Sequence, residues 1–431
     1  MINHKQHIIK YFESGIKDTK NFKMGIEHEK FLFYQKTNKR VNYSTVQKMF
    51  SALTEFGWKP IMEKQNIIGL QKKGKSITLE PGNQIELSGD KLNNIHEACS
   101  ESHDYLFELQ QVTKKLDLKM VSSGFDPISN LDEVPNNPKQ RYEVMTKDMP
   151  NGGPLSLDMM YRTCGTQLNL DYNSEEDFIK KFKIINSLVP ISIALFANSS
   201  IVEKKNSGYM SYRSKVWQET SRGGLPEIFF DNMNFEKYAD FSINFPLLFI
   251  QNNKEYLSGK NYTFLDFMNR KITEVDNRLP TEDDLTTHLS TIFTENRLKK
   301  YIELRSMDTC GWDCLCAGPA FNTGILYGNL DETYELISKW DKNKIINAYL
   351  EAPKKGFNTE LMGKDLLHWS SILLSISKKG LEKRDVLNKS NESEVKFLSH
   401  LEKLIESKTT NADHMLKKFS KNENLNDLYD K

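Results

Sequence analysis

The pattern of apolar and polar residues predicts several short β-strands in the first three quarters of the chain. Residues 166–172 and 301–308 alternate between the two kinds, and residues 24–34 end in a run of aromatic and aliphatic side chains. Such patterns are typical of strands that bury one face. Two more strands are expected around residues 76–80 and 84–89, because the turn dipeptide Pro81-Gly82 separates them.

Apolar residues at helical spacing predict helices over residues 2–13, 43–57 and 95–118, and the second ends on Gly57. Residues 188–202 form the most apolar window. They include proline, asparagine and serine and fall short of the ~20 apolar residues that span a bilayer, so we expect a buried helix there. From Ile325 the pattern is helical, and the polar end of the chain is expected to fray.

Helices and short polar-faced strands follow one another without the regular rhythm of β–α–β units, which favours an α+β fold with an antiparallel sheet. Neither a linker nor an internal repeat divides the sequence. We therefore expect a single domain over residues 1–431. Its parts are a core over about 20–330, a helical part over 331–420 and a tail over 421–431 without fixed structure.

Composition narrows the class of protein. The 59 Lys and Arg residues balance 58 Asp and Glu residues, so no global charge favours nucleic acid or an anionic membrane. The N-terminus lacks the apolar core of a secretory signal. Five cysteines, an odd and sparse set, indicate a reducing cytoplasm. Three of them crowd over residues 310–316, but zinc would need a second cluster, so ordinary free thiols are expected.

Period-2 alternation gathers carboxylates and amides on one face of four segments. These faces carry Glu27 and Glu29; Thr78, Glu80, Glu86 and Ser88; Gln167, Asn169 and Asp171; and Tyr301, Glu303 and Arg305. A solvated face usually mixes in Lys, Ser and Thr, whereas Mg²⁺ requires oxygen ligands such as these. Magnesium would also offset the repulsion between neighbouring carboxylates on one strand. The pattern favours a metal-dependent phosphoryl-transfer site over a solvated outer face.

Neither a G-x-x-x-x-G-K-[ST] loop nor a G-x-G-x-x-G loop after a strand is present, so phosphates would be held by metal ions and arginines. Arginines suited to grip carboxylate or phosphate are Arg141, Arg162, Arg213 and Arg305, although each alone would more often be structural. His28 lies between Glu27 and Glu29 and would point to the opposite face, as a structural histidine.

Six stretches, in chain order, resemble glutamate–cysteine ligase of the plant and alphaproteobacterial type. They are MGIEHEKFLF, ITLEPGNQIELSG, RYEVM, MMYRTCGTQLNLD, LFANSSIVEKKNSGYMSYRSKVW and HLSTIFTENRLKKYIELRSMD. The resemblance runs from about residue 20 to residue 330. It implies a glutamine synthetase-like carboxylate–amine ligase fold, in which a curved antiparallel sheet forms a funnel-shaped site with helices outside. It also implies one catalytic domain.

The resemblance further implies an activity. ATP and Mg²⁺ would serve to join the γ-carboxyl of L-glutamate to the amine of L-cysteine through γ-glutamyl phosphate, the first step of glutathione biosynthesis. Glu27, Glu29, Glu80, Glu86 and Glu303 would hold magnesium, with Gln167 as their neighbour. Arg141 and Arg213 would grip the amino-acid substrates, and Arg162 and Thr166 would lie in the substrate pocket. Arg305, beside Glu303, would face the transferring phosphoryl group.

Plant members of this family are redox-regulated through a disulfide. Cys316 lies near one of the cysteines involved, and no cysteine is expected where its partner would be. A cytoplasmic monomer is therefore expected, with small-molecule partners only: glutamate, cysteine and ATP, with neither nucleic acid nor membrane. Three alternatives stay open: a carboxylate–amine ligase for another small amine, an inactive relative with a binding role, and a metal-dependent hydrolase.

Overall fold

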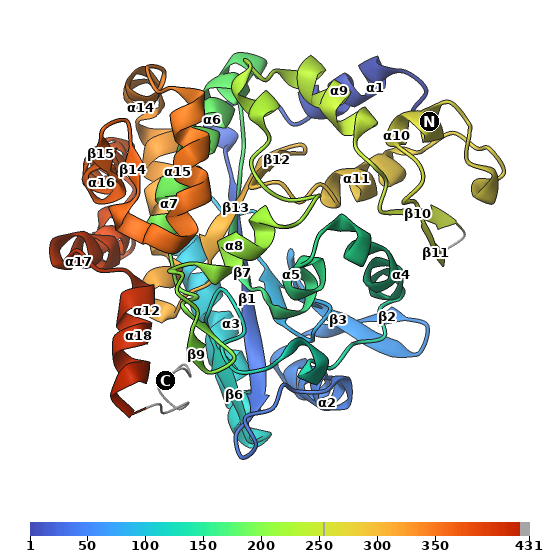
Figure 1. The fold of residues 1–431 in the computed structure, drawn as a ribbon, viewed down its shortest axis with the longest axis horizontal. Helices are drawn as coiled ribbons and strands as arrows, with labels where there is room; N and C mark the ends of the chain where they lie inside the picture. The colour runs from blue at the N-terminus through green and yellow to red at the C-terminus, as the bar shows by residue number, and fades with distance from the viewer. Residues whose placement is uncertain (253–254, 423–431) are drawn as a thin grey trace.

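The computed structural model describes residues 1–252 and 255–422, and its centre is a nine-stranded sheet (Figure 1). Every pairing in this sheet is antiparallel. The strands follow the order β12 (Asn296–Leu298), β13 (Ile302–Asp308), β7 (Gly165–Leu170), β1 (Met24–Tyr34), β5 (Ile85–Ser88), β4 (Lys75–Leu79), β3 (Asn66–Lys72) and β2 (Lys59–Glu63). The ninth strand, β6 (Leu118–Val121), pairs with the far end of β1. The predicted antiparallel α+β fold is confirmed.

Helices surround the sheet, and those from the last quarter of the chain gather on one side of it (Figure 1). The helices are α1 (Lys5–Glu13), α2 (Tyr43–Leu53), α3 (Ile95–Lys115), α4 (Gln140–Asp148), α5 (Ser156–Arg162), α6 (Glu175–Ser187), α7 (Val189–Leu195), α8 (Tyr212–Gln218), α9 (Phe235–Asn244), α10 (Phe264–Met268), α11 (Glu282–Ser290), α12 (Trp312–Leu315), α13 (Ala317–Thr323), α14 (Leu330–Ile337), α15 (Lys342–Lys355), α16 (Leu366–Arg384), α17 (Ser399–Ser407) and α18 (Asn411–Asn422). Three two-stranded hairpins complete the fold: β8 (Ile201–Val202) with β9 (Lys205–Asn206), β10 (Phe249–Asn252) with β11 (Glu255–Ser258), and β14 (Glu360–Leu361) with β15 (Lys364–Asp365).

Strand β1 gives the sheet its two faces. Ile26 and Leu32 point into the apolar cores, where the first packs with Leu168 of β7 and the second with Leu87 of β5. Helices α2 and α3 cover the core under β3, β4 and β5, while α6, α7 and the C-terminal helices cover the core under β7 and β13. Since side chains alternate along a strand, Glu27 and Glu29 are turned to the other face. The apolar residues of β1 therefore fix where its carboxylates point.

Local signals explain the boundaries of α2. The side chain of Asn42 accepts a hydrogen bond from the backbone N–H of Thr45 at the start of the helix, as an N-cap does. A short 3₁₀ turn follows the helix, and Gly57 ends it with a φ of +87°, a conformation that favours glycine. The predicted boundary at Gly57 is confirmed.

The helix expected over residues 188–202 is shorter than predicted. Helix α7 covers Val189–Leu195 only, and the chain then turns. The backbone N–H of Asn198 donates to the Asp308 carboxylate at 2.8 Å, and the Ser199 hydroxyl donates to the same carboxylate at 2.6 Å. These bonds to β13 replace the bonds that would continue the helix. No helix within the described residues has the length and apolar composition needed to cross a membrane.

The expectation of free thiols over residues 310–316 is wrong for all three cysteines there. Disulfides join Cys99 to Cys316 and Cys310 to Cys314, with Cα atoms 5.8 Å apart in each pair, and Cys164 alone is free and buried. Cys99 lies on α3, 217 residues from Cys316, so packing of α3 against the start of α13 supplies the partner that the sequence did not reveal. Helices α14 to α18 and the β14–β15 hairpin lie in the part of the chain after residue 330, and the expected tail falls largely on residues 423–431, outside the described residues.

Candidate active site

A pocket opens over the polar face of the sheet, where β1, β5 and β7 meet the loops and helices above them. Carboxylates from three segments and arginines from four segments line it together. Eight of the residues expected in the site from the sequence lie in its wall: Glu27, Glu29, Glu80, Glu86, Gln167, Arg141, Arg213 and Arg305. Residues far apart in the sequence are thus brought into one cavity.

Strand register builds an acidic floor, by which we mean Glu27, Glu29, Glu80 and Glu86. Glu29 lies directly opposite Glu86 of β5, and Glu27 lies between Ser88 of β5 and Gln167 of β7. Directly opposite carboxylates repel each other, which costs stability unless a cation or a proton intervenes. The register therefore creates a site for positive charge.

Hydrogen bonds from neighbouring strands hold these carboxylates in place. The backbone N–H of Gly165 donates to Glu29 at 2.5 Å, and the amide of Gln167 donates to its second oxygen at 3.2 Å. The side chain of Asn169 donates to Glu27 at 2.9 Å, and the Thr78 hydroxyl donates to Glu86 at 2.6 Å. These bonds orient Glu27, Glu29 and Glu86 toward the pocket.

Three carboxylates of the floor, those of Glu27, Glu29 and Glu86, hold their protons unusually tightly. Burial and the charges of Glu303 and Glu86 raise the pKa of Glu27 to about 7. Burial and the charges of Glu86 and Glu80 raise the pKa of Glu29 well above its usual range, and burial together with Glu80 raises that of Glu86. Positive charge bound here would release these protons.

Helix α4 contributes the wall beside Glu80. The Arg141 guanidinium donates to the Tyr142 hydroxyl at 3.0 Å, and this hydroxyl donates to the Leu79 carbonyl at 2.7 Å. The Nζ atom of Lys139 donates to the same carbonyl at 2.7 Å. Burial and the charge of Arg141 lower the pKa of Lys139 to about 8. The wall thus fixes Arg141 next to the acidic floor.

Arg213 of α8 lies beside Gly165, the first residue of β7, and beside Arg305 of β13. Its guanidinium donates to the Arg305 carbonyl at 2.8 Å. A Cβ atom on Gly165 would lie 2.8 Å from the nearest Arg213 nitrogen, so a larger residue there would push the guanidinium away. The Nε atoms of Arg213 and Arg305 are buried, and no described residue accepts a hydrogen bond from them. Both guanidinium groups have donors left for an anionic ligand.

The opposite end of the polar face is a compensated cluster, by which we mean Arg297, Lys299, Glu303 and Arg305. The fully buried Glu303 carboxylate accepts from Arg297 and Arg305, each at 2.6 Å, and from Lys299 at 2.8 Å. Burial acts to raise the pKa of Glu303, but the charges of Arg297, Lys299 and Arg305 outweigh it and hold the pKa well below its usual range. This carboxylate is already neutralised by protein cations.

Three predicted residues stand outside the pocket wall. Thr166 shares the strand parity of Leu168 and points to the apolar face. Arg162 is turned away, pairs with Asp158 at 2.8 Å and Glu203 at 3.2 Å, and stacks over Phe125. The structure thus corrects the substrate-pocket assignment of both. Glu303 sits behind Arg297 and Arg305, so its roles as magnesium ligand and catalytic group stay predictions.

Sequence reasoning missed a second set of wall residues. Arg297 of β12 belongs to a strand that was not predicted, and its three residues are too few for a periodic signal. The apolar wall consists of Met145, Met159, Met160, Trp217, Phe249 and Phe293. Helical spacing could not distinguish these side chains from core residues. His28, by contrast, points away from the pocket as expected, with its Nε2 3.1 Å from the Thr309 hydroxyl.

Solved structures share this fold. Glutamate–cysteine ligase from Francisella tularensis in complex with AMP superposes with a TM-score of 0.52 at 13% identity, covering 93% of this chain and 85% of that one. A bifunctional glutathione synthetase from Pasteurella multocida gives a TM-score of 0.51 at 12% identity, covering 99% of this chain and 53% of that one. Fold and site together define the class: an α+β protein whose antiparallel sheet carries a pocket lined by carboxylates and arginines, with the fold of these two structures.

Sequence comparison narrows the class to a family. The model of glutamate–cysteine ligase family 2 matches residues 23–431. Chloroplastic glutamate–cysteine ligase B of rice is 38% identical over 418 residues, which is 96% of this chain and 83% of that protein. The chloroplastic enzyme of tobacco is 37% identical, covering 96% of this chain and 79% of the relative. The chain belongs to glutamate–cysteine ligase family 2.

Proposed function

We propose that this protein joins the γ-carboxyl of L-glutamate to the amine of L-cysteine at the expense of ATP, as the first step of glutathione biosynthesis. One observation carries the proposal: a single pocket sets the acidic floor beside Arg141, Arg213 and Arg305. A hydrolase would need the carboxylates but not this set of arginines. Membership of the family and the AMP complex of the Francisella enzyme support the assignment.

The donor set of the floor fits magnesium. Among the described residues, no three carboxylate, imidazole or thiol groups come together as a ready-made metal cage. Mg²⁺, however, is usually held by one or two carboxylates together with water and substrate phosphates. Glu27, Glu29, Glu80 and Glu86, with Gln167 beside them, would hold it here. When bound, the ion supplies the positive charge that lets ATP phosphates approach a carboxylate substrate.

The arginines would orient the reacting groups. Arg141 of α4 and Arg213 of α8 both line the pocket and suit bidentate contacts with the carboxylates of amino-acid substrates. Arg305 belongs to the compensated cluster, lines the pocket and also donates to Gln167 beside the acidic floor, so it would stabilise charge on the transferring phosphoryl group. Holding the acyl phosphate next to the amine removes several kcal/mol of entropic barrier.

The apolar wall favours an acceptor with a soft side chain. Three methionine thioethers and three aromatic rings line that side of the pocket. Polarisable sulfur groups contact aromatic rings favourably, so this wall suits a thiol better than a charged side chain. Cysteine fits this description, as would a similar small amine.

Phosphate release from ATP tests the function. Purified protein is incubated with Mg²⁺, ATP and glutamate, with and without cysteine, and the γ-glutamyl product is followed by mass spectrometry. We expect product and stoichiometric phosphate only when cysteine is present. Release that follows another amine but ignores cysteine would assign a different acceptor. No turnover with any amine would contradict a ligase function. The cytoplasmic location and monomeric state stay predictions.

A further inference from the structure

Two segments that are distant in sequence form one side of the pocket. The first is the turn between β4 and β5, residues 80–84, which contributes Glu80, Pro81 and Gln84. The second is the end of α5 and the residue after it, which contribute Met159, Met160 and Thr163. Their spacing sets the distance between the acidic floor and the apolar wall. We therefore looked for contacts that join the two segments on the side away from the pocket.

Direct contact between the segments is tight. The Gln84 side chain donates to the carbonyls of Met160 at 3.2 Å and Thr163 at 3.1 Å. A Cβ atom on Gly82 would lie 2.6 Å from the Tyr161 carbonyl oxygen, closer than side chains tolerate. The carbonyls of Gly82 and Tyr161 therefore lie near each other, and their partial negative charges need a common donor.

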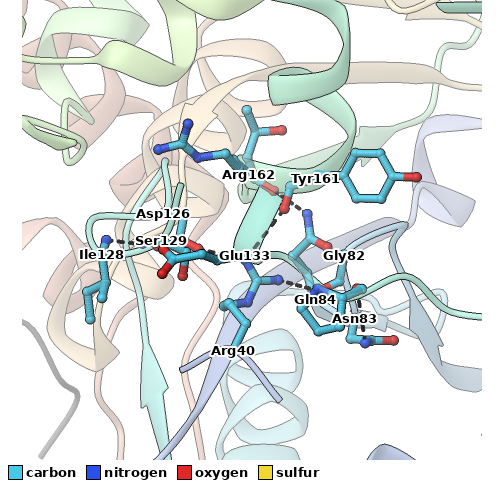
Figure 2. Close-up of polar contacts among 12 residues, drawn as sticks. Arg40, Gly82, Asn83, Gln84, Asp126, Ile128, Ser129, Glu133, Tyr161 and Arg162 are labelled. Atoms are coloured by element: carbon cyan, nitrogen blue, oxygen red, sulfur yellow. Dashed lines mark hydrogen bonds and ion pairs between the residues drawn. The ribbon is translucent and has the colours of Figure 1, made fainter. Parts of the chain in front are cut away.

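Arg40 is that donor (Figure 2). Its guanidinium donates to the Gly82 carbonyl through one nitrogen, while the other nitrogen lies 3.5 Å from the Tyr161 carbonyl. The second nitrogen also donates to the Asp126 carboxylate at 2.8 Å. The cation lies over the Phe31 ring of β1, 4.7 Å from its centroid. One side chain thus joins the turn, the end of α5 and β1.

Asp126 completes the arrangement. Its second carboxylate oxygen accepts from the backbone N–H groups of Ile128 at 2.8 Å and Ser129 at 2.9 Å (Figure 2). Its own N–H donates to the Arg162 carbonyl at 2.8 Å. The side chains of Arg40 and Asp126 are 1% and 0% exposed, and neither lines the pocket. A fully buried ion pair is weak evidence for stability alone, so its location behind the wall suggests another role.

We propose that Arg40 and Asp126 form a positioning pair that fixes the Glu80 turn against the Met159–Met160 wall and so sets the geometry of the pocket beside the acidic floor. This inference rests on the proposed function. Arg40 acts through Gly82 and Tyr161 and touches no substrate. Its planar fork reaches two carbonyls and a carboxylate at once, which the point charge of a lysine cannot do.

The test uses Arg40→Lys in the full-length protein. Lysine keeps the charge opposite Asp126 but loses the fork. We expect hydrogen exchange in peptides covering residues 80–86 and 156–163 to quicken roughly tenfold, while exchange elsewhere stays unchanged. We also expect the KM for MgATP to rise about tenfold. The KM for glutamate should stay within about twofold of the wild-type value, because the proposed glutamate ligand Arg213 lies on α8.

Two further variants keep the test decisive. Arg384→Lys is the matched control, because Arg384 also pairs with a buried carboxylate, that of Glu394 at 3.1 Å, and lies beside an aromatic ring away from this pocket. It should leave both KM values unchanged. If Arg40→Lys folds poorly, Arg40→Gln combined with Asp126→Asn removes both charges while retaining polar partners.

The outcomes separate the possible roles. Unchanged exchange in both peptides would overturn the positioning role, and so would faster exchange with wild-type KM values. A purely structural pair would lower the melting temperature and the active fraction without changing either KM. Should the wild-type protein lack ligase activity, the proposed function fails. Hydrogen exchange would still decide whether Arg40 joins the two segments, and binding of a magnesium complex of a non-hydrolysable ATP analogue would replace the KM.

Discussion

Glu29 and Glu303 are glutamates on the same face of one sheet, two strands apart, with opposite surroundings. Glu29 faces Glu86 across β1 and β5, and burial with its acidic neighbours raises its pKa well above the usual range. Glu303 has three cationic partners, which hold its pKa well below that range. The acidic floor therefore lacks positive charge that a ligand must bring, whereas the compensated cluster carries its own. The same residue type is thus left without a cationic partner on one strand and neutralised by three of them on another.

The largest change in stability is expected for Glu303→Gln. Removing this charge leaves Arg297, Lys299 and Arg305 buried beside one another without a counter-ion, which should destabilise the fold by about 3–5 kcal/mol. Urea denaturation measures the free energy of unfolding. Glu282→Gln is the control, because Glu282 pairs with Lys300 at the surface and should change stability by less than ~0.5 kcal/mol. Equal effects of the two changes would contradict the comparison.

Glu29→Gln should have the opposite signature. The free energy of unfolding at pH 8 should stay unchanged or rise by up to about 1 kcal/mol, because a repelled charge is removed. Activity at fixed Mg²⁺ should fall on the order of 100-fold, since a ligand charge is lost. Steady-state kinetics over a range of Mg²⁺ concentrations, together with denaturation, would reveal both effects. If the variant lost stability but kept the wild-type magnesium requirement, Glu29 would resemble Glu303, and the comparison would be wrong.

Arg213→Lys distinguishes an arginine of the pocket from one outside it. Exchanging a bidentate donor for a point charge should raise the KM for glutamate roughly tenfold with a smaller effect on kcat. Arg162→Lys provides the comparison, because Arg162 is paired with Asp158 and Glu203 outside the wall. We expect its KM values to stay near those of the wild type. If Arg162→Lys raised the KM for glutamate more than Arg213→Lys does, Arg162 would belong in the substrate pocket after all.

The smallest effect concerns pH. The pKa of Glu27 is raised from 4.5 to about 7 in the folded protein. Between these two pH values the folded state therefore binds more protons than the unfolded state. Without metal, stability should therefore fall as pH rises through this window. Magnesium removes the repulsion, so 10 Kd of Mg²⁺ should add about 1.4 kcal/mol at pH 8 and less at pH 5.5. Melting temperatures with and without MgCl₂ measure this; an equal gain at both pH values would argue against binding at the floor.

Strand alternation was enough to predict the acidic floor. The face of Glu27 and Glu29 follows from Ile26 and Leu32 on the same strand, and that of Gln167 follows from Leu168. The sequence could not predict pairings that depend on packing. Cys99 meets Cys316 through the placement of α3, and the buried Arg162 side chain pairs with Asp158, one helical turn earlier, away from the pocket. An arginine has several reachable carboxylates, and only the assembled fold selects one.

Gly165 makes two parts of the site interdependent. Its N–H donates to Glu29, and its Cα lies against the Arg213 guanidinium, which a larger side chain at this position would displace. Any ligand that alters the charge on Glu29 therefore acts on the peptide that supports Arg213. We expect heterotropic cooperativity between magnesium and the amino-acid substrate. By linkage, the factor by which the metal improves affinity for the amino acid equals the factor by which the amino acid improves affinity for the metal.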